Sequence, residues 1–192
     1  MSSIAIQRAA PANPVNTAVA TAQIFTMASN PLLAASVSLP GKLAIEQKRF
    51  TLRAEGNATV STAAYTIKAT LFGASALPSA PLTPANWTLL GAGTARAVAA
   101  AGTVPWWIEA NLIMDSTSGL LQGTFQQLVN NLFDAAAAIT NQVTGLNGTN
   151  VTVTQATVPI PPADPVAWFA VGITFGTAGA NSANLANFEI GF

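Results

Sequence analysis

Apolar and polar residues alternate along several segments of the chain, with the period of two that is typical of β-strands. Within residues 50–54, the apolar Phe50 and Leu52 fall on one face of the predicted strand. Residues 65–72 and 151–158 alternate in the same way. Each pattern predicts a strand with one face in a core and the other face polar.

Further short segments, spaced by about 10–15 residues and without strong helix caps, also predict strands. These are residues 23–27, 87–90, 94–99, 106–114, 120–128, 166–175 and 186–192. The segment 166–175 is apolar nearly throughout, which is typical of a strand buried on both faces. Residues 134–139 predict either one turn of helix or a poor strand.

The number and spacing of these segments indicate an all-β chain. Roughly eight to ten strands in one domain are typical of a sandwich or a barrel. We therefore expect an antiparallel, jelly-roll-like β-sandwich over residues 41–192.

Residues 1–40 are interrupted by four prolines, each of which disfavours a helix through its own position. The same segment carries apolar residues such as Ile4, Ile24 and Phe25, which a purely solvated tail would not need. We interpret the segment as an extended N-terminal arm that becomes ordered against a neighbouring molecule. A disordered tail is the alternative interpretation.

The composition removes most enzymatic chemistry. The 192 residues include no cysteine and no histidine, which excludes disulfides, thiolate nucleophiles, the Ser-His-Asp triad and the common zinc sites. Glu109 and Asp115 would lie about 20 Å apart along one strand, at roughly 3.3 Å per residue, which is too far for paired carboxylate catalysis. We expect no enzyme activity, no cofactor and no metal site.

Charged side chains make up only 7% of the chain, against roughly 25% in an ordinary soluble domain, and the formal net charge is zero. A free protein usually stays soluble through charges of both signs and protects its sheet edges with them. The outward positions of the predicted strands carry Thr, Ser, Asn and Gln instead. We infer that copies of the chain and other proteins cover most of the surface; a low working concentration is the alternative.

The few charges are unevenly placed along the chain. The first 100 residues hold seven basic and two acidic side chains, a net charge of +5, and the remaining residues hold five acidic side chains and no basic one. Either these charges pair across strands within one sandwich, or a basic arm meets an acidic neighbour. The balanced total argues against direct binding of nucleic acid.

No segment predicts a membrane helix, because the best apolar stretch, residues 89–114, is broken by Arg96, Pro105 and Glu109. The first eight residues lack the order of charged and then apolar residues that a signal peptide shows. We therefore expect no membrane partner.

Trp106 and Trp107 are adjacent, so their side chains point to opposite faces of the predicted strand. One of them belongs to the core, and the other is exposed, at a subunit interface or against a ligand. Core plus interface is the preferred interpretation, since tryptophan is enriched at interfaces. Stacking of a glycan on Trp107 or Trp168 is the alternative.

Six segments follow one another in the order Leu39-Pro-Gly41, Phe50-Thr-Leu-Arg-Ala-Glu-Gly56, Tyr65-Thr-Ile-Lys-Ala-Thr-Leu, Pro105-Trp-Trp-Ile-Glu-Ala-Asn-Leu, Asp115-Ser-Thr-Ser-Gly-Leu-Leu-Gln-Gly123 and Phe169-Ala-Val-Gly-Ile-Thr-Phe-Gly with a closing Asn187-Phe-Glu-Ile. This order resembles structural proteins of tailed-bacteriophage virions, particularly head decoration (cement) and fibre-like proteins with a jelly-roll domain. The resemblance covers residues 39–192 through loose strand and turn patterns. It implies a sandwich that commonly forms trimers, an N-terminal segment tied to the shell, and no catalysis.

We therefore expect a structural virion protein: a capsid decoration protein that binds the assembled head as a homotrimer, with the major capsid protein or other virion proteins as partners. It would be made in the host cytoplasm and reside on the capsid surface or the tail. A receptor- or glycan-binding tail or fibre module is the alternative. The residues expected to contact the shell are Ile4, Ile6, Arg8, Val15, Ile24, Phe25, Lys42, Lys48 and Arg49, and those expected to mediate self-association are Trp107, Phe175, Phe188 and Phe192.

Overall fold

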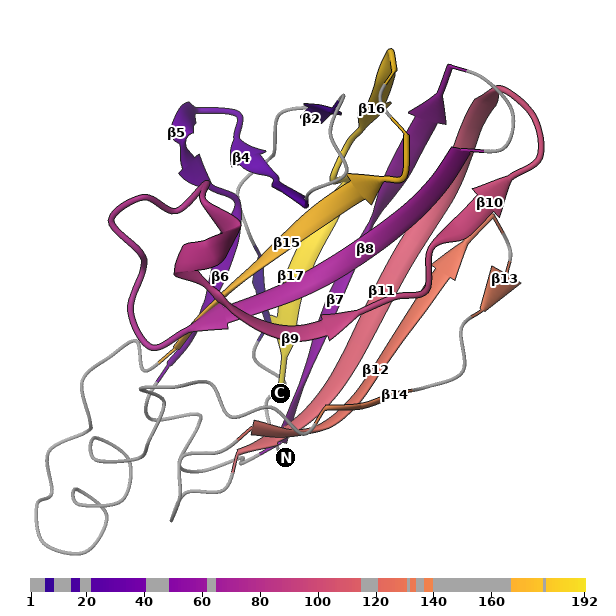
Figure 1. Ribbon diagram of the computed structural model, residues 1–192. Helices are drawn as coiled ribbons and strands as arrows, with labels where there is room; N and C mark the ends of the chain where they lie inside the picture. The colour runs from indigo at the N-terminus through magenta and orange to yellow at the C-terminus, as the bar shows by residue number, and fades with distance from the viewer. Residues whose placement is uncertain are drawn as a thin grey trace, which may run out of the picture.

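Two antiparallel β-sheets packed face to face form the body of the protein (Figure 1). The computed structural model describes residues 6–8, 15–17, 22–40, 49–61, 65–114, 121–130, 132–133, 137–139, 167–177 and 179–192. The predicted strand at 151–158 lies outside these residues. The all-β, antiparallel sandwich expected from the alternation of apolar and polar residues is confirmed.

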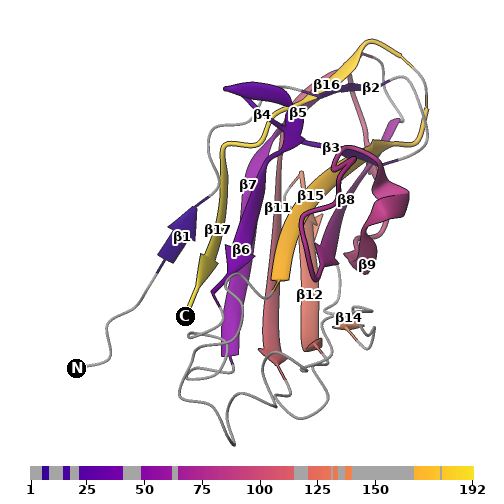
Figure 2. The ribbon, with the colours of Figure 1, turned by 90° about the vertical axis from the view of Figure 1, so that its left-hand side faces the viewer.

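The first sheet has nine strands. Its main path runs β1 (Ile6–Arg8), β17 (Asn187–Gly191), β7 (Arg49–Val60), β11 (Gly102–Met114), β12 (Leu121–Val129) and β13 (Leu132–Phe133). Three short strands complete it: β14 (Ala137–Ile139) pairs with β12, and β16 (Asn181–Ala183) links β7 to β2 (Val15–Thr17). Figure 2 shows β1 beside β17 at one edge of this sheet.

The second sheet has six strands. Its path runs β10 (Arg96–Val98), β8 (Tyr65–Ala74), β15 (Ala167–Phe175) and β3 (Gln23–Ile24), while β6 (Ser36–Leu39) also pairs with β15 and β9 (Thr88–Ala92) pairs with β8. A separate hairpin of β4 (Thr26–Met27) and β5 (Asn30–Ala34) lies at one end of the molecule, and a single turn of 3₁₀-helix, η1 (Pro84–Asn86), precedes β9 (Figure 1).

The core lies between the two sheets and is built by alternate residues of each strand. Along β7 the even-numbered side chains are buried and the odd-numbered ones face outward, as the pattern at Phe50 and Leu52 predicts. The two adjacent tryptophans separate in the same way, with Trp106 in the core and Trp107 half-buried on the outer face. The expectation that the tryptophans point to opposite faces is confirmed.

A second, smaller apolar cluster covers the outer face of the six-stranded sheet. Trp87 and Leu82, which flank η1, pack there against Phe72, Trp168 and Ala170. The Trp87 indole N–H donates a hydrogen bond to the Pro81 carbonyl at 2.8 Å, which fixes the ring over the sheet. Strand β15 is therefore buried on both faces, as its continuous apolar sequence predicts.

The segment expected to be an arm contributes strands to both sheets. Strands β1 and β2 pair with the first sheet, and β3 and β6 pair with β15 in the second. The Phe25 ring stacks on Trp106 in the core, with ring centroids 5.6 Å apart and ring planes 11° apart. Residues 22–40 are therefore part of the sandwich rather than a separate extension.

Candidate interaction surface

The outer face of the nine-stranded sheet carries mostly polar side chains, several of them short. Their cross-strand hydrogen bonds follow the strand register: Thr51 Oγ1 donates to Asn111 Oδ1 at 3.0 Å, and the hydroxyl groups of Thr59 and Thr103 lie 2.8 Å apart. Such pairs stabilise the sheet and leave no long side chain standing above it at these positions.

One row of charged residues crosses this face at right angles to the strands. Arg8 on β1, Glu189 on β17, Arg53 on β7 and Glu109 on β11 are successive register partners, so positive and negative charges alternate over four neighbouring strands. Arg8 Nε lies 3.0 Å from Glu189 Oε2, and Arg53 Nε lies 2.8 Å from Glu109 Oε2. The Asn111 side-chain amide donates to the other oxygen of Glu109 at 2.8 Å.

The two arginines of this charge row stand out from the surface more than the two glutamates do. The exposed fractions are 67% for Arg8 and 55% for Arg53, against 17% for Glu189 and 20% for Glu109. Water screens such pairs, so each contributes only ~0–1 kcal/mol to folding. Of the two interpretations of the uneven charge distribution, the structure shows cross-strand pairing for these four residues.

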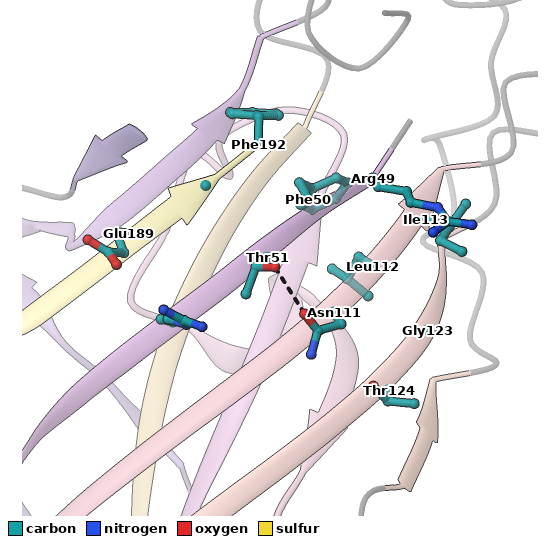
Figure 3. A pocket seen from close by; sticks show the side chains of 12 residues that line it. Arg49, Phe50, Thr51, Asn111, Leu112, Ile113, Gly123, Thr124, Glu189 and Phe192 are labelled. Atoms are coloured by element: carbon teal, nitrogen blue, oxygen red, sulfur yellow. Dashed lines mark hydrogen bonds between the residues drawn. The ribbon is translucent and has the colours of Figure 1, made fainter. Parts of the chain in front are cut away.

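An open depression of about 620 Å³ lies on one side of the charge row (Figure 3). The apolar Phe50, Leu112 and Phe192 line it together with the polar Thr51 and Asn111. Figure 3 shows Arg49 and Ile113 side by side where β7 begins and β11 ends, and the two residues are register partners.

A second depression, of about 400 Å³, lies on the other side of the charge row. Its lining residues are Arg53, Glu55, Trp107, Glu109, Asn187 and Glu189. Arg53 lines both depressions and therefore stands between them.

The side chains of the two depressions are mainly polar and charged groups of the sheet surface. Arg53 lies between Glu109 and Glu189 in the charge row, Glu55 lies two residues further along β7, and the sequence has no histidine or cysteine. Among the described residues, no three acidic side chains come close enough together to hold a metal ion. The surface can instead form hydrogen bonds, ion pairs and one aromatic contact.

The residues predicted to bind a shell fall into three groups. Arg8 and Arg49 are exposed on the outer face of the nine-stranded sheet. Ile24 and Phe25 are buried: Phe25 belongs to the core between the sheets, and Ile24 belongs to the smaller apolar cluster. The backbones of Ile6 and Val15 lie in β1 and β2, whereas Ile4, Lys42 and Lys48 lie outside the described residues.

The residues predicted to mediate self-association are also divided between interior and surface. Phe175 and Phe188 are fully enclosed in the core, where no other molecule can contact them while the sandwich is intact. Trp107 lies on the outer face, in the second depression. Phe192 is half-buried beside the first depression, 6.2 Å from the ring centroid of Phe50.

Two surface features were not predicted from the sequence. The charge row depends on strand register between residues up to 181 positions apart, which local patterns do not encode. The β4–β5 hairpin presents Leu32 with 75% of its surface exposed, although large apolar residues are usually buried. The hairpin turns at Ala28-Ser29, and directly after the turn the Asn30 side chain accepts a hydrogen bond from the Leu32 N–H at 3.0 Å.

No protein-family model matches the chain, and no curated protein matches it in sequence. Among solved structures, the chain is similar to one described as the structure of infectious bursal disease virus, Gx strain, with 13% sequence identity and a TM-score of 0.34. The similarity covers 99% of this chain but only 33% of that one, so the chain spans about a third of its length. A likeness of this size carries no argument about function. In the described residues, no helix has the length and apolar character needed to cross a membrane.

Proposed function

We propose that the protein is a structural component of a virus particle, a capsid decoration protein that binds the assembled head as a homotrimer. The observation that carries this proposal is the nature of the sandwich surface. Its charges are few, and the four of the charge row neutralise one another in pairs. Large apolar side chains are exposed at several separate positions, namely Leu32, Leu33, Leu77, Leu89 and Ile113.

A surface of this kind favours contact with other proteins over free solution. Solubility of a single copy normally depends on many charges and a net charge away from zero. When a neighbouring protein covers exposed apolar side chains, the free energy of the complex falls by about 25 cal/mol per Å² of apolar area buried. The resemblance of the strand and turn order to virion structural proteins of tailed phages supports a virus particle as the setting.

The proposed mechanism is stabilisation by binding. A protein that binds the assembled shell but not its separated subunits shifts the equilibrium towards the shell by its binding free energy. The chain would be made in the host cytoplasm and reside on the capsid surface, in contact with the major capsid protein. The contacts proposed for the shell are the N-terminal residues Ile4, Ile6 and Arg8 with Val15, and the basic Lys42, Lys48 and Arg49; those proposed for the trimer are Trp107 and Phe192.

Removal of residues 1–20 tests the proposal, because the described core begins after them, at Ile24 and Phe25. We expect the shortened protein to fold and to form the trimer, because Trp107 and Phe192 are retained, but to lose its binding to particles in a co-sedimentation assay. The matched control keeps the length and scrambles the order of residues 1–20, and it should bind no better than the shortened protein. Normal coating of particles by the shortened protein would contradict the proposal.

A second candidate function is a receptor- or glycan-binding module of a tail or fibre, and the depression at Trp107 favours it. An indole ring can stack on the apolar face of a sugar, and the carboxylates of Glu55 and Glu109 can accept hydrogen bonds from sugar hydroxyl groups. Trp107→Ala should then abolish binding to a polysaccharide array without unfolding the protein. The control is Leu89→Ala, which changes an exposed residue of the other sheet. No binding by the unaltered protein eliminates this candidate.

A further inference from the structure

The order of signs in the charge row makes the outer face of the nine-stranded sheet complementary to itself. Across β1, β17, β7 and β11 the charges run positive, negative, positive, negative. A two-fold axis parallel to the strands, placed between β17 and β7, reverses this order in a second copy. Arg8 then faces Glu109 of the other copy, and Glu189 faces Arg53, which gives two kinds of opposite-charge contact, each made twice.

Other two-fold arrangements of this face are less favourable. An axis along the charge row places each residue opposite its own copy, so that Arg8 faces Arg8 and Glu109 faces Glu109. Like charges placed opposite one another across an interface disfavour association. An axis parallel to the strands but shifted by one strand, between β7 and β11, leaves Glu189 opposite Gln126, because Gln126 is the register partner of Glu109 on β12.

The residues around the charge row allow the two faces to approach. Beside the row, Glu55 on β7 would face Asn187 of the other copy, and Thr51 would face Gly191, since each pair shares a register row. These contacts bring no like charges together. Among the described residues, the outward positions of β7, β11, β12 and β17 include no lysine, the residue that most often prevents sheets from associating.

The exposure of the side chains suits contacts between copies. The two arginines, which are more than half exposed, extend towards a facing molecule, whereas the two glutamates remain in the sheet surface. A carboxylate has about four lone-pair positions, so each glutamate can accept a bond from a second arginine while it keeps the first.

We propose that this outer face is a two-fold interface between two copies of the chain, with the charge row setting its register. The proposal does not depend on the decoration function. It uses the face on which Arg8 and Trp107 lie, so the two-fold contact and the trimer contact proposed at Trp107 are alternatives for this face. Ion pairs of this kind fix orientation more than they add affinity, and salt screens them. The interface should therefore form at low ionic strength and weaken as salt is added.

Two double exchanges test the interface, and each keeps both ion pairs within the chain, one of them with its charges reversed. Arg53→Glu with Glu109→Arg gives a row that reads positive, negative, negative, positive. Arg8→Glu with Glu189→Arg gives negative, positive, positive, negative. Each row now faces its own copy with like charges, so we expect self-association to weaken by at least about tenfold. The two variants are complementary to each other, and an equimolar mixture should recover the association.

The variant with all four exchanges reads negative, positive, negative, positive and is self-complementary again. It should associate like the unaltered protein, as measured by sedimentation velocity at low and high salt, and circular dichroism should show that every variant is folded. Unchanged association of both double variants would overturn the proposal, as would a mixture that associates no better than its components. If one double variant fails to fold, the other still decides, because each involves a different ion pair. Removal of residues 1–20 also removes Arg8, so that variant is scored for shell binding alone, and the charge exchanges alone decide the two-fold interface. Scored in this way, the two proposals can fail independently.

Discussion

The Gln127 side chain connects the two sheets through the core, because its Oε1 accepts a hydrogen bond from the Ala69 backbone N–H at 2.6 Å. Gln127 belongs to β12 in the first sheet, and Ala69 belongs to β8 in the second. Strand β9 pairs with residues 70–73 of β8, and strand β10 pairs with residues 65–67 of β8. Ala69 lies between these two paired stretches. The Gln127 amide also donates to the Thr94 carbonyl at 2.9 Å, so this buried side chain takes the place of a strand partner.

Replacement of this residue by an apolar one of similar size should destabilise the fold. Gln127→Leu removes the acceptor of the buried Ala69 N–H and the bond to the Thr94 carbonyl, which we expect to lower the free energy of unfolding by about 1–3 kcal/mol. Urea denaturation measures the change. The control is Gln122→Leu on the same strand, where the side chain is exposed and little change is expected. Equal stability of the two variants would show that the hydrogen bonds of Gln127 contribute nothing to the stability of the fold.

Phe25→Ala tests whether the N-terminal segment is part of the folded core. The ring is fully buried and stacks on Trp106, so its loss should leave a cavity and cost about 3–5 kcal/mol of unfolding free energy. Leu32→Ala, seven residues further along in the exposed hairpin, should change stability by no more than about 0.5 kcal/mol. Thermal unfolding of both variants provides the comparison, and a small effect of Phe25→Ala would place this segment outside the core.

Gly123→Ala should disturb the pairing of β11 with β12. Gly123 is the register partner of Leu112, and an added Cβ would collide with the carbonyl oxygen of Asn111. We expect a loss of more than about 1 kcal/mol, since the backbone of one strand must move. Gly191→Ala, in the same sheet, meets nothing within 4 Å and should be tolerated. Hydrogen exchange of the β11 and β12 amides would locate the effect, and unchanged protection would contradict it.

The ion pair between Arg53 and Glu109 should contribute little to folding. Because the arginine is more than half exposed, a double-mutant cycle with alanine at both positions should give a coupling of about 0.2–1 kcal/mol. The coupling should fall when the ionic strength rises from 0.01 M to 1 M, over which the screening length shortens from about 30 Å to about 3 Å. The measurement is made at high dilution, where copies are separate. A coupling that salt does not change would indicate a contact shielded from water.

Strand positions and the direction of each side chain could largely be predicted from the sequence. Alternation located β8 and the first half of β7, because a strand places successive side chains on opposite faces wherever it lies. The other predicted segments matched β11, β12 and β17 to within a few residues. The continuous apolar run of β15 likewise indicated burial on both faces. Residues 137–139 form a strand, which is the second of the two outcomes open for 134–139.

The candidate surface was only partly predictable. Arg8, Arg49, Trp107 and Phe192 were identified from residue type and all lie on or beside the outer face of one sheet. Phe25, Phe175 and Phe188 have the same chemistry but are buried. Residue type does not separate these groups, because an aromatic side chain suits an interface and a core equally well.

The sequence by itself determined that the chain is a sparsely charged, all-β protein without histidine or cysteine, since composition and a period of two are local properties. Only the tertiary structure decided which strands are neighbours, and therefore that Arg8, Glu189, Arg53 and Glu109 form one row. The physical reason is that strand pairing joins distant residues, such as Arg8 and Glu189 at 181 positions apart. The packing of the whole core selects those partners, and no local segment contains that information.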